Sequence, residues 1–108
     1  MVVKKDIVKV FISQPMVDKT DEQIKEERNR AILTIKEKFI DTDKELEIID
    51  SFFESAPHDA KPLWFLGKSF ELLSNADMAY FVKGWNNYRG CKMENLACKE
   101  YGIKTVEE

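Results

Sequence analysis

The chain has 108 residues, of which 44% are apolar and 34% charged, with a formal net charge of -3. This length suits a single domain, residues 1–108, with one modest core, and the acidic balance argues against a basic, nucleic-acid-binding surface. No apolar run approaches the ~20 residues that cross a bilayer, and no signal-peptide stretch opens the chain, so we expect a cytoplasmic protein without a membrane partner.

The first half of the chain predicts a strand, a helix and a second strand. The β-branched and aromatic run 8–12 predicts the first strand. Thr20 and Gln23 have the spacing of a capping box, and apolar residues then recur at helical spacing, so we expect a helix from about 21 to 39. Its core-facing stripe is Ile24, Ala31, Ile32, Ile35 and Phe39. The apolar run 46–49 predicts the second strand.

The second half predicts two further helices and two further strands. Pro62 suits the first turn of a strongly apolar helix that runs to about residue 74. The run 77–82 predicts a buried strand, and 91–101 a helix that Gly102 ends. The segment 103–106 predicts a last short strand.

The resulting order is β-α-β-α-β-α-β, which predicts the α/β class. We expect a three-layer, flavodoxin- or Rossmann-like sandwich around a four- to five-stranded, mainly parallel sheet. The loops 13–16, 50–61 and 83–90 follow successive strands, and the carboxyl ends of parallel strands meet at one edge, so these loops should converge on one cleft. Their candidate binding residues include an acid, a stacking aromatic, amide donors and an arginine: Asp50, His58, Asp59, Lys61, Trp85, Asn86, Asn87, Tyr88 and Arg89.

Glu94 lies on the first turn of the predicted third helix, above this cleft. A carboxylate there is a candidate for chemistry, but it could equally be an acid that stabilises the helix dipole by up to ~1 kcal/mol. Trp85 could stack on a base or only shape the cleft. His58 and Asp59 are adjacent, which favours ordering of the loop or capping of the next helix over joint action on one substrate atom.

Several known kinds of site are not indicated. The chain has no phosphate-binding loop, no dinucleotide-binding glycine pattern and no hydrolase nucleophile elbow. Cys91 and Cys98 are seven residues apart on one predicted helix, hence ~10 Å apart along its axis, which excludes a disulfide between them. With a single histidine, we expect packing cysteines, no metal site and no cofactor.

Three segments resemble the nucleoside 2-deoxyribosyltransferase superfamily, which includes the deoxynucleoside 5'-monophosphate N-glycosidases. Residues 10–16 (Val-Phe-Ile-Ser-Gln-Pro-Met) are similar to its first-strand motif, aromatic-Ile/Leu-Ser/Ala-x-Pro. Residues 76–81 (Ala-Asp-Met-Ala-Tyr-Phe) are similar to its Ala-Asp-hydrophobic strand. Residues 89–103 are similar to its Gly-x-x-x-Glu-x-x-x-Ala helix and final strand. The similarity is greatest to small bacterial and phage members.

The resemblance implies a substrate and a mechanism. Glu94 would be the nucleophile that attacks the anomeric carbon of a nucleoside or nucleotide, forming a glycosyl-enzyme intermediate. Backbone N–H groups at Arg89 and Gly90 would hold a phosphate or sugar oxygen. A homodimer or higher homo-oligomer would complete the site. The residues expected to bind substrate are Phe11, Ser13, Gln14, Pro15, Asp50, His58, Asp59, Trp85, Arg89 and Gly90.

Two departures from the family pattern leave the activity open. Phe11 stands where the family has a tyrosine hydroxyl, and Ser69 where the glycosidases carry an aspartate that helps to protonate the leaving base. Losing that acid removes a contribution of ~10²–10⁴-fold. The alternatives are therefore an enzyme acting through Glu94 and a nucleotide-binding or sensing module without turnover. A third class, a protein-interaction domain, would expose a large apolar patch, to which Phe52 and Phe53 could contribute.

Overall fold

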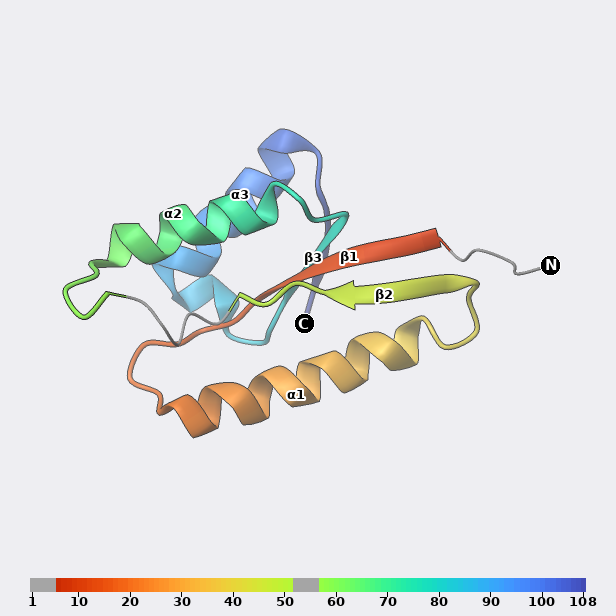
Figure 1. Ribbon diagram of the computed structural model, residues 1–108, viewed down its shortest axis with the longest axis horizontal. Helices are drawn as coiled ribbons and strands as arrows, with labels where there is room; N and C mark the ends of the chain where they lie inside the picture. The colour runs from red at the N-terminus through yellow and green to blue at the C-terminus, as the bar shows by residue number, and fades with distance from the viewer. Residues whose placement is uncertain (1–5, 52–56) are drawn as a thin grey trace.

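The computed structural model describes residues 6–51 and 57–108, so Phe52 and Phe53 lie outside the described residues. Its elements, in chain order, are β1 (Asp6–Ser13), α1 (Asp21–Lys38), β2 (Lys44–Ile48), α2 (Pro62–Leu73), β3 (Met78–Phe81), the short 3-10 helix η1 (Trp85–Asn87), α3 (Arg89–Tyr101) and β4 (Lys104–Glu107). All strand pairs are parallel, in the order β2-β1-β3-β4 (Figure 1). The predicted α/β class and element order are confirmed.

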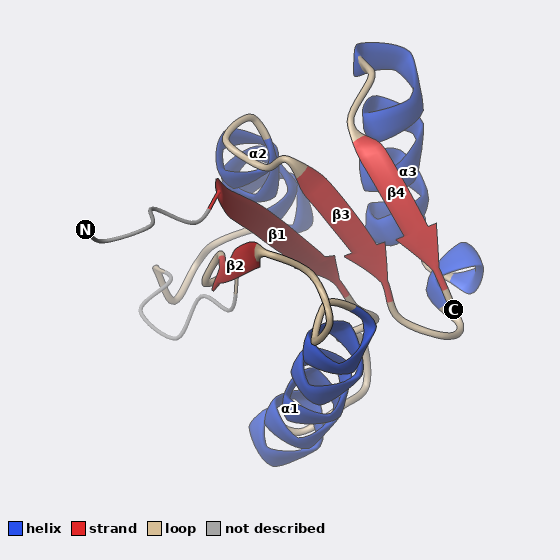
Figure 2. Ribbon diagram, turned by 90° about the vertical axis from the view of Figure 1, so that its right-hand side faces the viewer, coloured by secondary structure: helices blue, strands red, loops and turns tan. Residues whose placement is uncertain are grey.

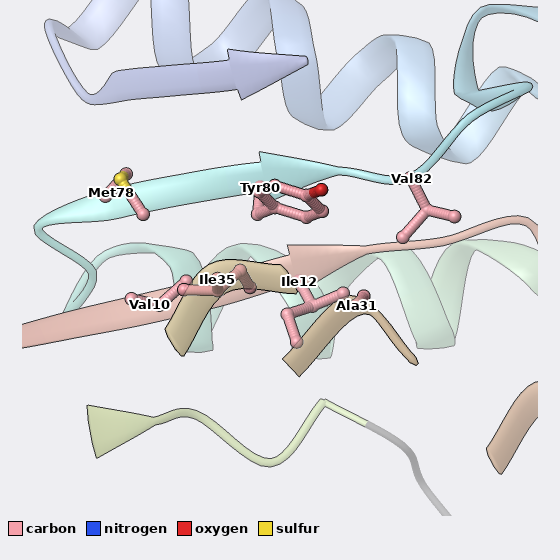
Figure 3. Packing of buried hydrophobic residues seen from close by; sticks show 7 residues of the cluster. All are labelled: Val10, Ile12, Ala31, Ile35, Met78, Tyr80 and Val82. Atoms are coloured by element: carbon pink, nitrogen blue, oxygen red, sulfur yellow. The ribbon is translucent and has the colours of Figure 1, made fainter. Parts of the chain in front are cut away.

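The sheet lies between two helical layers, which confirms the predicted three-layer sandwich. Helix α1 covers one face, and α2 and α3 cover the other (Figure 2). Successive side chains of a strand point to opposite faces, so β1 supplies both cores. Val10 and Ile12 pack with Ala31 and Ile35 of α1, as Figure 3 shows, whereas Phe11 packs toward the opposite face.

Helix α1 begins where the sequence predicts. Thr20 Oγ1 accepts a hydrogen bond from the Gln23 backbone N–H at 3.1 Å, and Gln23 Oε1 accepts one from the Thr20 N–H at 2.9 Å. This is a complete capping box. The predicted stripe faces the sheet, with Ile24, Ala31 and Ile35 each less than 5% exposed.

Helix α3 begins at Arg89, two residues before the predicted start, so the expectation that Glu94 lies on its first turn is wrong. Gly84, in the left-handed region at φ 92°, leads into η1, and Tyr88 then adopts an extended conformation as the N-cap. The Lys92 N–H donates to the Tyr88 carbonyl at 3.0 Å and closes the first turn. Glu94 therefore lies on the second turn, where a role as a helix-dipole acid no longer accounts for it.

Helix α2 leaves much apolar surface uncovered. Pro62 occupies its first turn as predicted, but Leu73 is its buried residue, and Leu63 is 78% exposed. Trp64 is half-buried, with its ring edge-on to Phe65 at a centroid distance of 5.1 Å. Among the described helices, none is both long and apolar enough to cross a membrane.

Candidate functional site

The candidate site lies at the carboxyl edge of the two central strands. Ser13 is the last residue of β1 and pairs with Phe81, the last residue of β3. The second turn of α3 brings Glu94 to this edge, where the Ser13 hydroxyl donates a hydrogen bond to Glu94 Oε1 at 2.8 Å. Glu94 is only 7% exposed. A carboxyl group is thus buried at the edge where ligands bind in parallel α/β proteins.

A second serine also reaches this carboxyl group. The hydroxyl of Ser69, on α2, is near enough to Glu94 to lower the pKa of its carboxyl group. Ser13, Ser69 and Glu94 come from β1, α2 and α3, so three separate elements meet at one carboxyl group. The hydrogen bond from Ser13 restricts the orientation of this buried group.

The environment of Glu94 balances its two protonation states. Burial, the dominant effect, raises the pKa of Glu94, and the hydroxyls of Ser13 and Ser69 lower it, leaving a pKa of about 7. At neutral pH the group is therefore present as carboxylate and as carboxylic acid in comparable amounts. It can attack an electrophile in the first state and donate a proton in the second.

Cys91 lies one turn before Glu94 and is also buried. Burial raises the pKa of its thiol to about 11, although a hydrogen bond with Ser13 acts in the opposite direction. The thiol is therefore protonated at neutral pH and is not an activated nucleophile. Cys98 is buried as well, and both cysteines are free.

The loop after β1 forms a partly buried polar cluster with α1, beside Ser13. Gln14 Nε2 donates to the Ile24 carbonyl oxygen at 3.0 Å and lies 3.4 Å from Glu27 Oε1. Lys19 Nζ makes an ion pair with Glu27 at 3.2 Å. Gln14 Oε1 is buried and has no hydrogen-bond partner among the described residues. Pro15 is fully buried.

Arg28 is a polar residue of this edge that the sequence analysis missed. It is 9% exposed, and its guanidinium donates to Ser51 Oγ at 3.0 Å and to the Ile49 carbonyl oxygen at 2.6 Å. Ser51 in turn donates to the Ile12 carbonyl oxygen at 3.2 Å. Burial lowers the pKa of Arg28, and Asp50 opposes this. Arg28 falls four residues after Ile24, on the apolar stripe of α1, and that position was the available signal.

The two predicted aromatic site residues both pack on the core. Phe11 is 1% exposed and belongs to the cluster beneath α2 and α3. Trp85 is half-buried, with its ring centroid 5.3 Å from that of Phe81 at an interplanar angle of 56°. The ring of Trp85 is thus anchored on the last residue of β3, next to the sheet edge that carries Ser13.

The remaining predicted binding residues are exposed or half-buried: Asp50, His58, Asp59, Lys61, Asn86, Asn87, Tyr88, Arg89 and Gly90. Within residues 6–51 and 57–108, no hydrogen bond joins His58, Asp59 or Arg89 to Glu94. His58 and Asp59 also do not cap α2, whose N-cap is Lys61 without a side-chain hydrogen bond. Arg89 and Gly90 are the first two residues of α3 rather than a turn before it.

A hollow of about 260 Å³ lies where α1 meets the start of β2, at the opposite end of the sheet from Ser13. It is lined by Lys36, Phe39, Ile40, Thr42, Lys44 and Leu46. In the described part of the chain, no three His, Cys, Asp or Glu side chains are grouped so that they could hold a metal ion.

Comparison with known proteins adds a structural relative. No family model matches the sequence, and no curated protein matches it. A solved structure, that of a conserved protein from Enterococcus faecalis V583, is similar with a TM-score of 0.63 and 16% sequence identity. The match covers 94% of this chain but 62% of that protein, so the chain spans less than two thirds of its length. At this identity the similarity shows a shared fold alone.

Proposed function

We propose that this chain binds a nucleoside or nucleotide and cleaves or transfers its N-glycosidic bond through Glu94. The observation that carries the proposal is the carboxyl group of Glu94, buried at the carboxyl edge of the sheet and hydrogen-bonded by Ser13. Burying a carboxyl group destabilises a fold unless it is neutralised or paired, so such groups are concentrated at functional sites. The family resemblance of residues 89–103 supplies the reaction.

In the proposed reaction, the ionised carboxylate of Glu94 attacks the anomeric carbon of the sugar. The C–N bond breaks, its electron pair leaves with the base, and the base takes up a proton from solvent water. Water or a second base then displaces the glycosyl ester and restores the carboxylate. The Ser13 hydroxyl, 2.8 Å from Oε1, holds the carboxyl group in place during the attack.

Ser69 bears on the rate of this reaction. The resemblance places at this position the aspartate that protonates the leaving base, and the serine found there is near enough to Glu94 to lower its pKa. Serine is too weak an acid to protonate a base at neutral pH. We therefore expect turnover that is slower by ~10²–10⁴-fold than with a carboxyl group at this position.

The residues at positions 11 and 69 favour a second candidate function, a nucleotide-binding or sensing module. Phe11 offers no hydroxyl, and its ring lies in the core rather than beside Glu94. With Phe11 and Ser69 in these two positions, the site would keep its binding groups but lose two catalytic ones.

The experiment is base release from a panel of 2'-deoxynucleosides and their 5'-monophosphates, followed by chromatography. We expect Glu94→Gln, which keeps the shape and the hydrogen-bonding capacity of the side chain, to lower release by more than ~10³-fold. Glu100→Gln, an exposed acid on the same helix, is the matched control and should match the wild type.

The outcomes separate the two functions. Release that Glu94→Gln leaves unchanged contradicts the proposed nucleophile. Binding of panel members without release supports the sensing module. Absence of both binding and release contradicts the nucleoside proposal as a whole.

A further inference from the structure

We propose that Gln14 determines ligand specificity at this site, with its Oε1 accepting a hydrogen bond from a neutral donor of the ligand. The donor would be a sugar hydroxyl or an N–H group of the base. The inference rests on the proposed function for the class of ligand and adds a residue that recognises it.

The first observation is a buried acceptor without a partner. Gln14 is 5% exposed, and its Oε1 has no hydrogen-bond partner among the residues that the structure describes. A buried polar atom without a partner costs about 1–3 kcal/mol, and native proteins satisfy nearly all such atoms. The acceptor is therefore expected to be completed by a group from outside this part of the chain.

The second observation is that the amide orientation is fixed. Nε2 donates to the Ile24 carbonyl oxygen at 3.0 Å, and it lies 3.4 Å from Glu27 Oε1. Both partners can only accept, so a flipped amide would place Oε1 against two oxygen atoms. The ion pair of Glu27 with Lys19 holds this arrangement. Oε1 therefore points away from the Ile24 carbonyl oxygen and the Glu27 carboxylate.

The third observation is the place of Gln14 beside the proposed reaction centre. It directly follows Ser13, whose hydroxyl is hydrogen-bonded to Glu94. Ser13 ends β1, so Gln14 and the carboxyl group of Glu94 both lie at the carboxyl end of this strand.

The chemistry of the cluster selects the kind of donor. An amide oxygen only accepts, so a phosphate or carboxylate group, which offers acceptors, does not fit it. The negative charge of Glu27 is already paired with Lys19, so the cluster has no unbalanced charge that would attract a cation. A neutral O–H or N–H group is what remains.

The test uses ligand analogues that each lack one donor. Affinities are measured by calorimetry for the panel members that bind, for their 3'-deoxy analogues without the sugar hydroxyl, and for analogues without the exocyclic amino group of the base. In the wild type, we expect one of the two deletions to weaken binding about 5- to 15-fold. Gln14→Met keeps a similar volume without the acceptor, so it should bind the parent more weakly and be insensitive to that deletion.

Several outcomes overturn the proposal. If Gln14→Met responds to both deletions as the wild type does, Oε1 takes its hydrogen bond from water and Gln14 has no such role. If the variant does not fold, the wild-type series still decides, because no loss with either deletion contradicts the proposal. If the wild type binds no panel member, the proposed function fails as well. Binding that Gln14→Met leaves unchanged overturns the role of Gln14 alone.

Discussion

Ionising Glu94 is unfavourable for the folded protein, and this gives a first prediction at the scale of single residues. The pKa of Glu94 is about 7, above the value near 4.5 expected in the unfolded chain. The folded protein binds this proton more tightly than the unfolded chain does, so the protonated group stabilises the fold. Its contribution to the free energy of unfolding is fully present below about pH 4.5 and is lost as the pH rises through 7. Once the pH is well above 7, the loss amounts to about 3 kcal/mol.

Glu94→Gln keeps the side-chain shape and removes the titration, so its stability relative to the wild type should increase between pH 5 and 8.5. Denaturant unfolding at several pH values measures this. Glu100→Gln, on the exposed face of α3, serves as the control and should give a flat difference. A flat difference for Glu94→Gln as well would show that the carboxyl group is not buried in solution.

The sequence predicts part of this site and misses the rest for a physical reason. The family resemblance marks Ser13, Gln14 and Glu94, and the rule that the carboxyl ends of parallel strands meet predicts that they lie at one edge of the sheet. The sequence cannot show that Ser13 and Glu94, 81 positions apart, are hydrogen-bonded, since that contact depends on how α3 sits on the sheet. Arg28 is absent from the predicted core-facing stripe because it is charged, although its position four residues after Ile24 follows that stripe.

At the scale of elements, the start of α1 is set by the capping box of Thr20 and Gln23, which can be recognised from the sequence alone. Thr20→Ala removes the acceptor for the Gln23 N–H and should destabilise the protein by about 1 kcal/mol. Thr34→Ala is the matched control inside the same helix, where alanine has the better helix propensity and no loss is expected. Equal effects of the two substitutions in chemical denaturation would contradict the capping role.

The start of α3 and the burial of α2 are harder to predict from the sequence. The start of α3 was predicted two residues late, because its N-cap is Tyr88, which is not one of the usual capping residue types and makes no side-chain capping hydrogen bond. The apolar pattern of α2 predicted a helix correctly. That pattern does not predict how much of the helix is buried against the sheet, and Leu63 is in fact 78% exposed.

At the scale of the whole molecule, Glu108 connects helix α1 to the central sheet. Its carboxylate accepts hydrogen bonds from Arg30 of α1 at 3.1 and 3.2 Å, from the Tyr80 hydroxyl of β3 and from the Lys83 N–H at 2.8 Å. Burial acts to raise the pKa of Glu108, but the hydrogen bonds from Arg30, Tyr80 and Lys83 outweigh it and lower the pKa to about 2. The charged form is therefore the one that the fold stabilises.

This lowered pKa predicts how the fold loses stability in acid. A carboxylate with a lowered pKa stabilises the fold in full above about pH 4.5, the value expected in the unfolded chain, and that contribution is lost as the pH falls toward 2. Glu108→Gln should therefore destabilise the protein by about 1–2 kcal/mol at pH 7, and the difference from the wild type should shrink between pH 4.5 and 2.5. Glu47→Gln, an exposed acid of β2, removes the same charge and is the control. A difference that stays constant down to pH 2.5 would show that the network is not charged in the folded state.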